Sequence, residues 1–201
     1  MVTEHYYSKK PTIDSAPQTW NVQLLGESFT FTSDKGVFSK GGVDFGSRLL
    51  IEHFKEPKTK GDILDLGCGY GPIGIALASA HKNRHVILSD VNERALHLAT
   101  QNKDINHIDN ISVVNSDGLS DMMDHTFAAI VTNPPVRAGK KLIYTMFRDS
   151  WKVLKEQGQL WAVIQKKQGA PSAKAELQHV FGDVIIVARS KGYYILRATK
   201  S

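Results

Sequence analysis

From residue 62 onward, short apolar segments of strand length alternate with segments whose apolar residues recur at helical spacing. Strands separated by helices form parallel sheets whose two faces are both covered. A tight connection at 189–192 makes the last strand antiparallel to its predecessor. The sequence therefore predicts an α/β fold with strands at 63–65, 86–88, 111–114, 127–131, 160–164, 184–187 and 193–196. Helices are expected at 72–80, from Asn92, at 142–154 and at 173–181, with a turn at Gly158.

The first 60 residues follow a different pattern. Alternating segments at 20–25 and 28–32, separated by Gly26 and Glu27, predict a β-hairpin. A helix is expected over 44–54, and residues 1–17 are expected to form an exposed arm. A chain of 201 residues fits one structural unit. Within it we expect an N-terminal arm, hairpin and helix at 1–60, packed on a core domain at 61–201.

Charge and cysteine content exclude several classes of protein. The net charge of +5 indicates a mild preference for an anionic partner and is far below the charge of a histone-like protein. The single cysteine excludes an internal disulfide and a thiolate cluster, and it suits a reducing cytoplasm. No apolar segment approaches the ~20 residues of a membrane span. This absence predicts no membrane partner. The histidines lack ligand spacing, so we expect no metal site.

Polar residues follow four successive expected strands. Asp65, Asp90, Asp117 and Asn133 each stand where a strand ends. In open parallel sheets, ligands bind beyond the carboxyl ends of the strands, near the point where the strand order reverses. An alternative is that these residues are only helix caps and turn residues. Their recurrence after successive strands favours a ligand site at one edge of the sheet.

The loop after the first of these strands is rich in glycine. Gly67, Gly69 and Gly71 alternate, which lets the backbone adopt positive φ and approach a ligand closely. A dinucleotide fingerprint would need a glycine where Pro72 stands. Asp65 opens the loop with a negative charge that repels phosphate and suits a cationic ligand. These features count against a nicotinamide oxidoreductase, which we keep as an alternative.

This loop resembles the D-x-G-x-G-x-G signature of class I S-adenosylmethionine methyltransferases. The resemblance implies a Rossmann-like seven-stranded sheet in the order 3-2-1-4-5-7-6, with residues 61–201 as the catalytic domain. It also implies that Asp65 lies near the cofactor amino group, Asp90 near the ribose and Asp117 near the adenine amine. S-adenosylhomocysteine would be the product, and no metal would be needed. The implied cofactor residues are Asp65, Gly67, Cys68, Gly69, Gly71, Asp90, Val91, Asp117, Gly118 and Asn133.

The loop after the fourth strand carries the chemistry. Asn133, Pro134, Pro135 and Val136 resemble the N/D-P-P-aromatic motif of methyltransferases that modify a planar amino nitrogen. The Asn133 side-chain oxygen and the Pro134 carbonyl can accept from the amine hydrogens and stabilise the positive charge that develops on nitrogen. The prolines restrict the backbone, so little reorganisation is needed. These three residues are the expected catalytic set, unless the motif is only a rigid turn.

Val136 departs from that motif, where adenine-N6 and glutamine-N5 methyltransferases usually have an aromatic residue. An aromatic partner for the substrate must therefore come from elsewhere or be absent. Phe38, Tyr144, Tyr6 and Tyr7 are the candidates. Of these, Phe38 joins Val136 in the expected substrate-binding set.

A second resemblance narrows the family. Residues 36–39, 43–47 and 49–50 are similar to the stretch before the cofactor loop in the small-methyltransferase-domain family. Known members include guanine-N2 methyltransferases of small-subunit ribosomal RNA, which also carry Asn-Pro-Pro before an apolar residue. Those enzymes have a degenerate domain before the catalytic one, and this chain resembles only their catalytic half. A second chain could replace the missing half, and monomer and homodimer both stay open.

Basic residues flank the expected substrate site. They are Arg137, Lys140, Lys141, Lys166 and Lys167, and they fall in loops at the same edge of the sheet. Phosphates of ribosomal RNA or a ribosomal subunit would be their partners. We therefore expect a cytoplasmic methyltransferase that modifies guanine N2. The alternatives are adenine N6, protein glutamine N5, and a non-catalytic RNA-binding protein with the cofactor fold.

Overall fold

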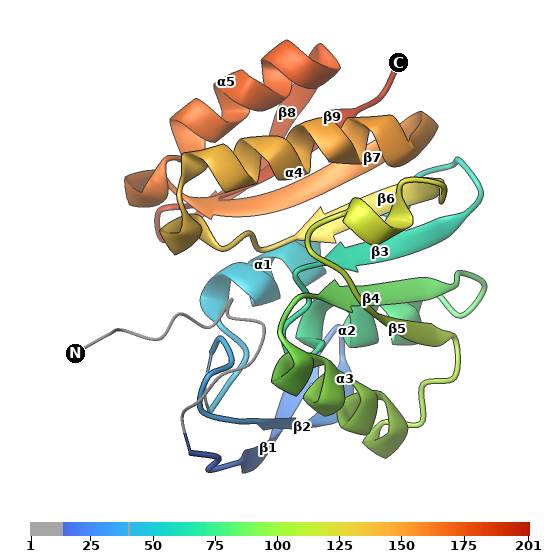
Figure 1. Cartoon of the computed structure of the whole chain (residues 1–201), viewed down its shortest axis with the longest axis vertical. Helices are drawn as coiled ribbons and strands as arrows, with labels where there is room; N and C mark the ends of the chain where they lie inside the picture. The colour runs from blue at the N-terminus through green and yellow to red at the C-terminus, as the bar shows by residue number, and fades with distance from the viewer. Residues whose placement is uncertain (1–13, 40) are drawn as a thin grey trace.

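The computed structural model describes residues 14–39 and 41–201, and Figure 1 shows a twisted sheet with helices on both faces. The predicted arm lies largely outside the described residues. Two strands form a separate hairpin, β1 (Gln18–Leu24) and β2 (Glu27–Ser33). The main sheet consists of β3 (Asp62–Leu66), β4 (Val86–Asp90), β5 (Ile111–Asn115), β6 (Phe127–Thr132), β7 (Leu154–Gln165), β8 (Asp183–Ser190) and β9 (Tyr193–Thr199).

The strand order confirms the predicted topology. Along the sheet the order is β5-β4-β3-β6-β7-β9-β8, which is 3-2-1-4-5-7-6 when these strands are numbered from β3. The first five strands pair in parallel, whereas β9 pairs antiparallel with both β7 and β8. The direction in which successive strands are added reverses at the β3–β6 pair: β4 and β5 lie on one side of β3, and β6 and β7 lie on the other. The carboxyl ends of β3, β4 and β6 therefore open into a common crevice.

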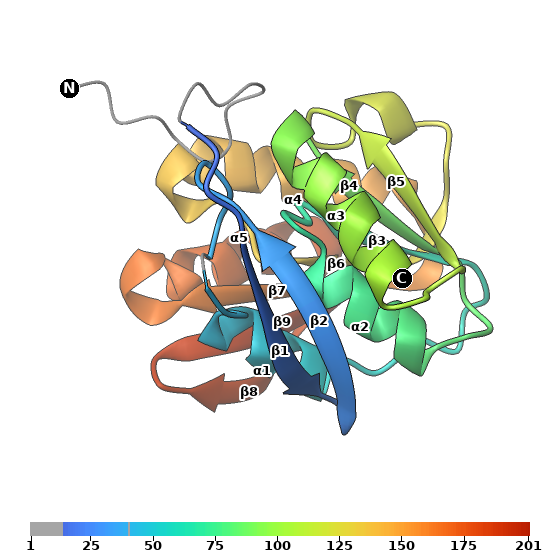
Figure 2. The same cartoon turned by 90° about the horizontal axis from the view of Figure 1, so that it is seen from below.

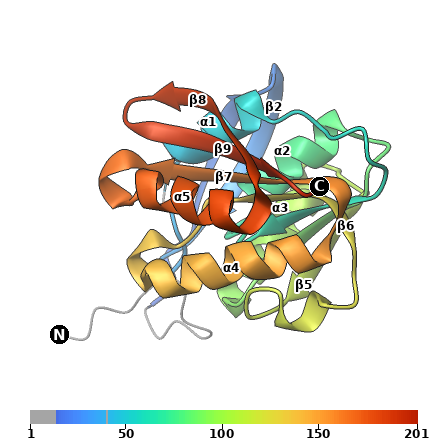
Figure 3. The same cartoon turned by 90° about the horizontal axis from the view of Figure 1, so that it is seen from above.

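Helices cover both faces of the sheet because its central strands are apolar on both sides. On β3, Ile63 belongs to the hydrophobic cluster under α1, α2 and α3, and Leu64 belongs to the cluster under α4 and α5. Figure 3 shows α4 and α5 side by side on one face, with α1 and α2 on the other. The helices are α1 (Phe45–His53), α2 (Pro72–Ala80), α3 (Glu93–Ile105), α4 (Lys140–Val153) and α5 (Ala170–Phe181).

The hairpin is held to α3 by side-chain amides. Asn102 and Asn106 each accept from a backbone N–H of β2 and donate to the carbonyl of the same residue, at Thr32 and Thr30 respectively. Figure 2 shows the hairpin lying alongside this helix. These bonds satisfy backbone groups at the edge of β2, and residues of the segment that follows β2 line the crevice.

One turn prediction is wrong. Gly158 lies inside β7, and the pairing of β6 with β7 skips from Leu154 to Gln159. A Cβ on Gly158 would stand 2.7 Å from the Lys155 carbonyl oxygen, so the chain is tightly folded there without leaving the sheet. Sequence pattern alone does not distinguish such an irregularity from a turn, because both require glycine in a close backbone approach. The helices α4 and α5 also begin two and three residues earlier than predicted.

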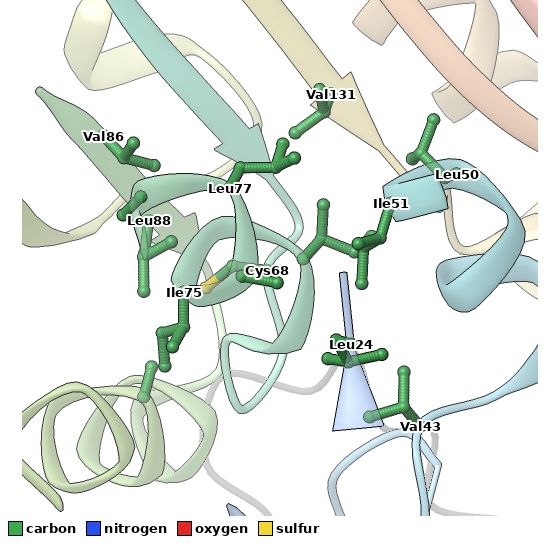
Figure 4. Close-up of a cluster of buried hydrophobic side chains, with 14 of the residues drawn as sticks. Leu24, Val43, Leu50, Ile51, Cys68, Ile75, Leu77, Val86, Leu88 and Val131 are labelled. Carbon is green, nitrogen blue, oxygen red and sulfur yellow. The ribbon is translucent and has the colours of Figure 1, made fainter. Parts of the chain in front are cut away.

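The larger hydrophobic cluster lies between the hairpin, α1, α2 and α3 (Figure 4). Leu24, Ile51, Ile75 and Leu88 from four different elements belong to it. Cys68 is buried among them, and burial raises the pKa of its thiol. This cysteine therefore packs as a small residue within the glycine loop. Within the described part of the chain, no helix is both long and apolar enough to cross a membrane.

Candidate active site

A cavity of about 620 Å³ opens at the carboxyl ends of the parallel strands. Its walls come from the segment after β2, the start of α1, and the loops after β3, β4, β5, β6 and β7. Most of the residues predicted from the sequence are brought together here. The predicted residues in its lining are Phe38, Gly67, Cys68, Gly69, Asp90, Val91, Asp117, Gly118, Asn133, Pro134, Pro135, Val136 and Arg137.

The glycine loop forms a smooth floor for the cavity. Gly67 and Gly69 have φ of +74° and +58°, and nothing lies within 4 Å of where a Cβ would stand on either. The loop is fixed from behind, because the N–H groups of Gly67 and Cys68 both donate to the Ser89 carbonyl. A ligand could therefore lie directly on the backbone. Gly71 is not part of the lining: a Cβ placed on it would face Ile75, Leu88 and Ala99, and it is the N-cap residue of α2.

Asp65 is fully buried beneath this loop. Its Oδ2 accepts from the Gly74 N–H at 2.8 Å, whereas no described residue makes a hydrogen bond to the buried Oδ1. Burial raises the pKa of Asp65 to about 7, and the negative charge of Asp90 adds to the rise. A buried acceptor without a partner is costly. An ammonium group, directly or through water, would supply the missing donor and favour the ionised carboxylate.

Asp90 is the last residue of β4 and Asp117 lies two residues after β5, and both line the cavity. Asp90 Oδ2 accepts from the Gly69 N–H at 2.9 Å, and Oδ1 accepts from Asn92 at 2.9 Å. Burial raises the pKa of Asp90, and these backbone donors oppose the rise. A carboxylate offers about four acceptor positions, so Asp90 can still accept from ligand hydroxyl groups. Asp117 is exposed, and no atom lies within 4 Å of a Cβ placed on its neighbour Gly118.

Asn133 is held from the opposite wall by the first turn of α1. Its Nδ2 lies 3.0 Å from Ser47 Oγ and 3.3 and 3.4 Å from the two Asp44 carboxylate oxygens. Because Nδ2 is used as a donor here, Oδ1 is the amide atom left to accept from a ligand. Asp44 also caps α1 by accepting from the Ser47 N–H at 3.1 Å.

The Pro134 carbonyl, the second predicted acceptor, already accepts from the Val136 N–H at 2.8 Å. Pro134 is buried, and a short 3-10 turn follows at Val136–Ala138. A carbonyl oxygen has two lone pairs, so a second hydrogen bond is still possible. The local bond makes the loop rigid and directs the remaining lone pair.

The predicted lysines lie around the cavity and do not line it. Lys140 and Lys141 begin α4, and Lys166 and Lys167 form a 3-10 turn after β7; all four are exposed. Lys140 Cε lies 3.9 Å from the Cβ position of Gly169, so the two basic segments are adjacent. Only Arg137 of the predicted cations reaches the lining.

Sequence reasoning missed several residues of the lining. Asp44 and Ser47 fall within the stretch used for the second family resemblance, which was the available signal. Tyr193 and Gln168 also line the cavity, and no motif in their segments points to them. Among the aromatic candidates, Phe38 lines the cavity, Tyr144 packs against the other hydrophobic cluster, and Tyr6 and Tyr7 lie outside the described residues. Across 14–39 and 41–201, no three His, Cys, Asp or Glu side chains are placed to hold a metal ion.

Comparison with known proteins gives a consistent picture. Residues 28–197 match the family model described as "Methyltransferase small domain". A Bacillus subtilis protein designated "Uncharacterized protein YbxB" is 54% identical to this chain over 200 residues. The match covers 99% of this chain and 100% of that protein. Ribosomal RNA large subunit methyltransferase G of Klebsiella pneumoniae is 30% identical over 204 residues, which are 98% of this chain and 53% of that protein.

Among solved structures, a Thermus thermophilus enzyme has a TM-score of 0.82 and 25% identity. It is described as a 16S rRNA N2 G1207 methyltransferase in complex with AdoMet and guanosine, and the match covers 95% of this chain and 52% of that one. The chain thus spans about half the length of the ribosomal RNA methyltransferases that it matches. A methyltransferase from Pyrococcus furiosus, with a TM-score of 0.68 and 19% identity, shares the fold.

Proposed function

The chain belongs to the methyltransferase small domain family, and we propose that it methylates the exocyclic N2 amine of a guanine in ribosomal RNA with S-adenosylmethionine as donor. The observation that carries the proposal is one cavity that combines the glycine floor, the strand-end carboxylates of Asp90 and Asp117, and an Asn133 amide with a defined orientation. Similarity to a structure described with AdoMet and guanosine supports both ligand classes.

The cavity suits the cofactor on three counts. Gly67, Gly69 and Gly118 leave open space where any other residue would place a side chain. The buried Asp65 Oδ1 has no hydrogen-bond donor among the described residues, and the cofactor amino group would supply one, directly or through water. Asp90 can accept from the ribose hydroxyls and Asp117 from the adenine amine. When bound, the cofactor supplies an electrophilic methyl group on a sulfonium. Direct displacement at that carbon requires neither a metal nor a covalent enzyme intermediate.

The Asn133 loop acts on the acceptor nitrogen. The lone pair of an exocyclic amine is delocalised into its ring, so the amine is a weak nucleophile. Asn133 Oδ1 and the Pro134 carbonyl accept from its two hydrogens, which favours tetrahedral nitrogen and stabilises the developing positive charge. One such preorganised group is worth about 3–4 kcal/mol in the transition state.

RNA is the substrate class that fits the rim. Arg137, Lys140, Lys141, Lys166 and Lys167 would contact phosphates beside an extruded or unpaired base. A ribosomal substrate implies work in the cytoplasm. We further propose that residues 61–201 form the catalytic domain that holds the cofactor, and that Phe38, Asp44 and Ser47, from the part of the chain before it, form one wall of the substrate site.

The test is methyl transfer from labelled S-adenosylmethionine to undermethylated small and large ribosomal subunits and to their naked RNA, followed by digestion to nucleosides. We expect label in N2-methylguanosine and a loss of about 100-fold or more with Asn133→Ala. Asn83→Ala is the matched control, because Asn83 is exposed and precedes β4 at the opposite edge of the sheet.

Other outcomes would change the proposal in defined ways. Label in N6-methyladenosine would keep the mechanism and replace the base, and label in protein would indicate glutamine N5. Cofactor binding without transfer to any substrate would indicate a non-catalytic RNA-binding role. Binding of a nicotinamide cofactor in place of S-adenosylmethionine would overturn the reaction class.

A further inference from the structure

The first residue of the last strand, Tyr193, lies in the wall of the cavity together with Asn133 and Val136. We propose that the Tyr193 ring stacks on the planar base whose amine is methylated and so supplies the aromatic contact that Val136 does not. This inference rests on the proposed function and names one of its substrate-contacting residues. Tyr193 lies 60 positions after Asn133 in the sequence, so no local sequence pattern connects it to the Asn-Pro-Pro motif.

The backbone of Tyr193 is fixed on both sides. It pairs with Gln165, the last residue of β7, and with Ser190 of β8. The Lys166 N–H donates to the Gly192 carbonyl at 2.7 Å, which ties the hairpin tip to the turn after β7. Tyr193 therefore stands at the carboxyl end of a parallel strand, where the sheet places its ligands, although it belongs to an antiparallel one.

The ring is supported from behind by α1. Its centroid lies 5.6 Å from that of Phe45, with the two ring planes tilted by 52°. A Cβ on Gly46 would stand 3.0 Å from Tyr193 Cε1 and 3.1 Å from Asp44 Oδ1. The Tyr193 ring and the Asp44 carboxylate that orients Asn133 therefore both lie against Gly46. A base stacked on this ring would bring its exocyclic amine close to the Asn133 amide.

The other aromatic residues of the lining are less suited to this role. Tyr70 is 1% exposed, packs in T-shaped contacts against Trp20 and Phe31, and donates to the Gly42 carbonyl. Phe38 is 41% exposed and lies in the segment between β2 and α1, outside any helix or strand. Tyr193 combines a partly buried side chain in the cavity wall with a position on a paired strand and the support of the Phe45 ring.

Two substitutions separate stacking from simple packing. Tyr193→Phe keeps the ring and removes the hydroxyl, whereas Tyr193→Leu keeps apolar volume against Phe45 and removes the ring. We expect Tyr193→Phe to match the wild type. We expect Tyr193→Leu to lower kcat/KM for the RNA by about tenfold to one-hundredfold, mainly through a higher KM, with unchanged affinity for S-adenosylhomocysteine. Adding Val136→Phe to Tyr193→Leu should restore most of the loss.

Each result decides the matter. Equal KM values for the wild type, Tyr193→Phe and Tyr193→Leu would overturn the inference, as would an equal loss in both variants. If Tyr193→Leu also weakens S-adenosylhomocysteine binding, the Val136→Phe rescue decides, and absence of rescue overturns the inference. Failure of the wild type to methylate ribosomal guanine would instead overturn the proposed function, and this inference with it.

Discussion

The Asn133 side chain donates through Nδ2 to both carboxylate oxygens of Asp44, at 3.3 and 3.4 Å, although the residues are 89 positions apart. A carboxylate only accepts, so this contact defines which amide atom faces α1 and which faces the cavity. Ser47 Oγ, at 3.0 Å from the same nitrogen, reinforces that orientation. The orientation of the Asn133 side chain is therefore set by the N-terminus of α1, which precedes the first strand of the main sheet in the sequence.

Replacing Asp44 should slow the chemical step without weakening cofactor binding. Asp44→Ser is the informative variant, because serine retains the helix cap and is too short to reach Asn133. We expect the single-turnover rate to fall about tenfold or more, less than for Asn133→Ala, since the amide is still present but no longer oriented. Thermal unfolding and S-adenosylhomocysteine affinity serve as controls and should stay near wild-type values. An unchanged rate would show that Asp44 has no orienting role.

Asp65 should make stability depend on pH. The pKa of Asp65 is about 7 in the folded protein, against an ordinary aspartate value of 3.8, so the folded state binds an extra proton between these pH values. The free energy of unfolding should then decrease as pH rises from about 4 to 7, by on the order of 3–4 kcal/mol from this group. Urea unfolding at pH 5 and pH 7.5 measures the change. Asp65→Asn should remove most of it, and an identical slope in the variant would contradict the assignment.

The lysines after β7 should contribute to RNA affinity through phosphate contacts. Lys166→Gln with Lys167→Gln is expected to reduce the slope of log K against log salt concentration by about 1.4 for a single-stranded site. Lys58→Gln with Lys60→Gln removes the same charge from the exposed linker before β3, at the opposite edge of the sheet. That control should leave the slope nearly unchanged. Equal effects of the two pairs would mean that only net charge matters.

Gly74 should tolerate no side chain. A Cβ there would overlap Leu88 Cδ2 and stand 3.1 Å from Asp65 Cβ, both in the packed interior between α2 and the sheet. We expect Gly74→Ala to destabilise the protein by about 1–3 kcal/mol in urea unfolding, although alanine is the better helix former. Adding Leu88→Ala should recover part of this loss by vacating the space. Additive destabilisation in the double variant would show that the clash lies elsewhere.

From the sequence by itself, the pattern of apolar segments predicted the fold class, and the family resemblance predicted the strand order, both of which the structure confirms. The candidate cofactor residues were also named from that resemblance, and their roles stay a prediction. Apolar periodicity identified the strands, and Asp65, Asp90, Asp117 and Asn133 marked their ends, because a parallel sheet brings all such ends to one edge. The glycine loop could also be predicted from the sequence, because positive φ and close approach of the backbone to a ligand are local requirements for glycine. The division at residue 60 stays a prediction.

Only the tertiary structure decided which residues complete the site. Asp44 and Tyr193 reach the Asn133 region through helix and strand packing across about 60 to 90 positions of sequence, which no local pattern encodes. Gly71 lies against the core instead of the cavity, and Gly158 lies within β7, because the neighbours that decide both come from other strands and helices. Local chemistry identified the ends of the strands, whereas long-range packing selected the side chains that face one another across them.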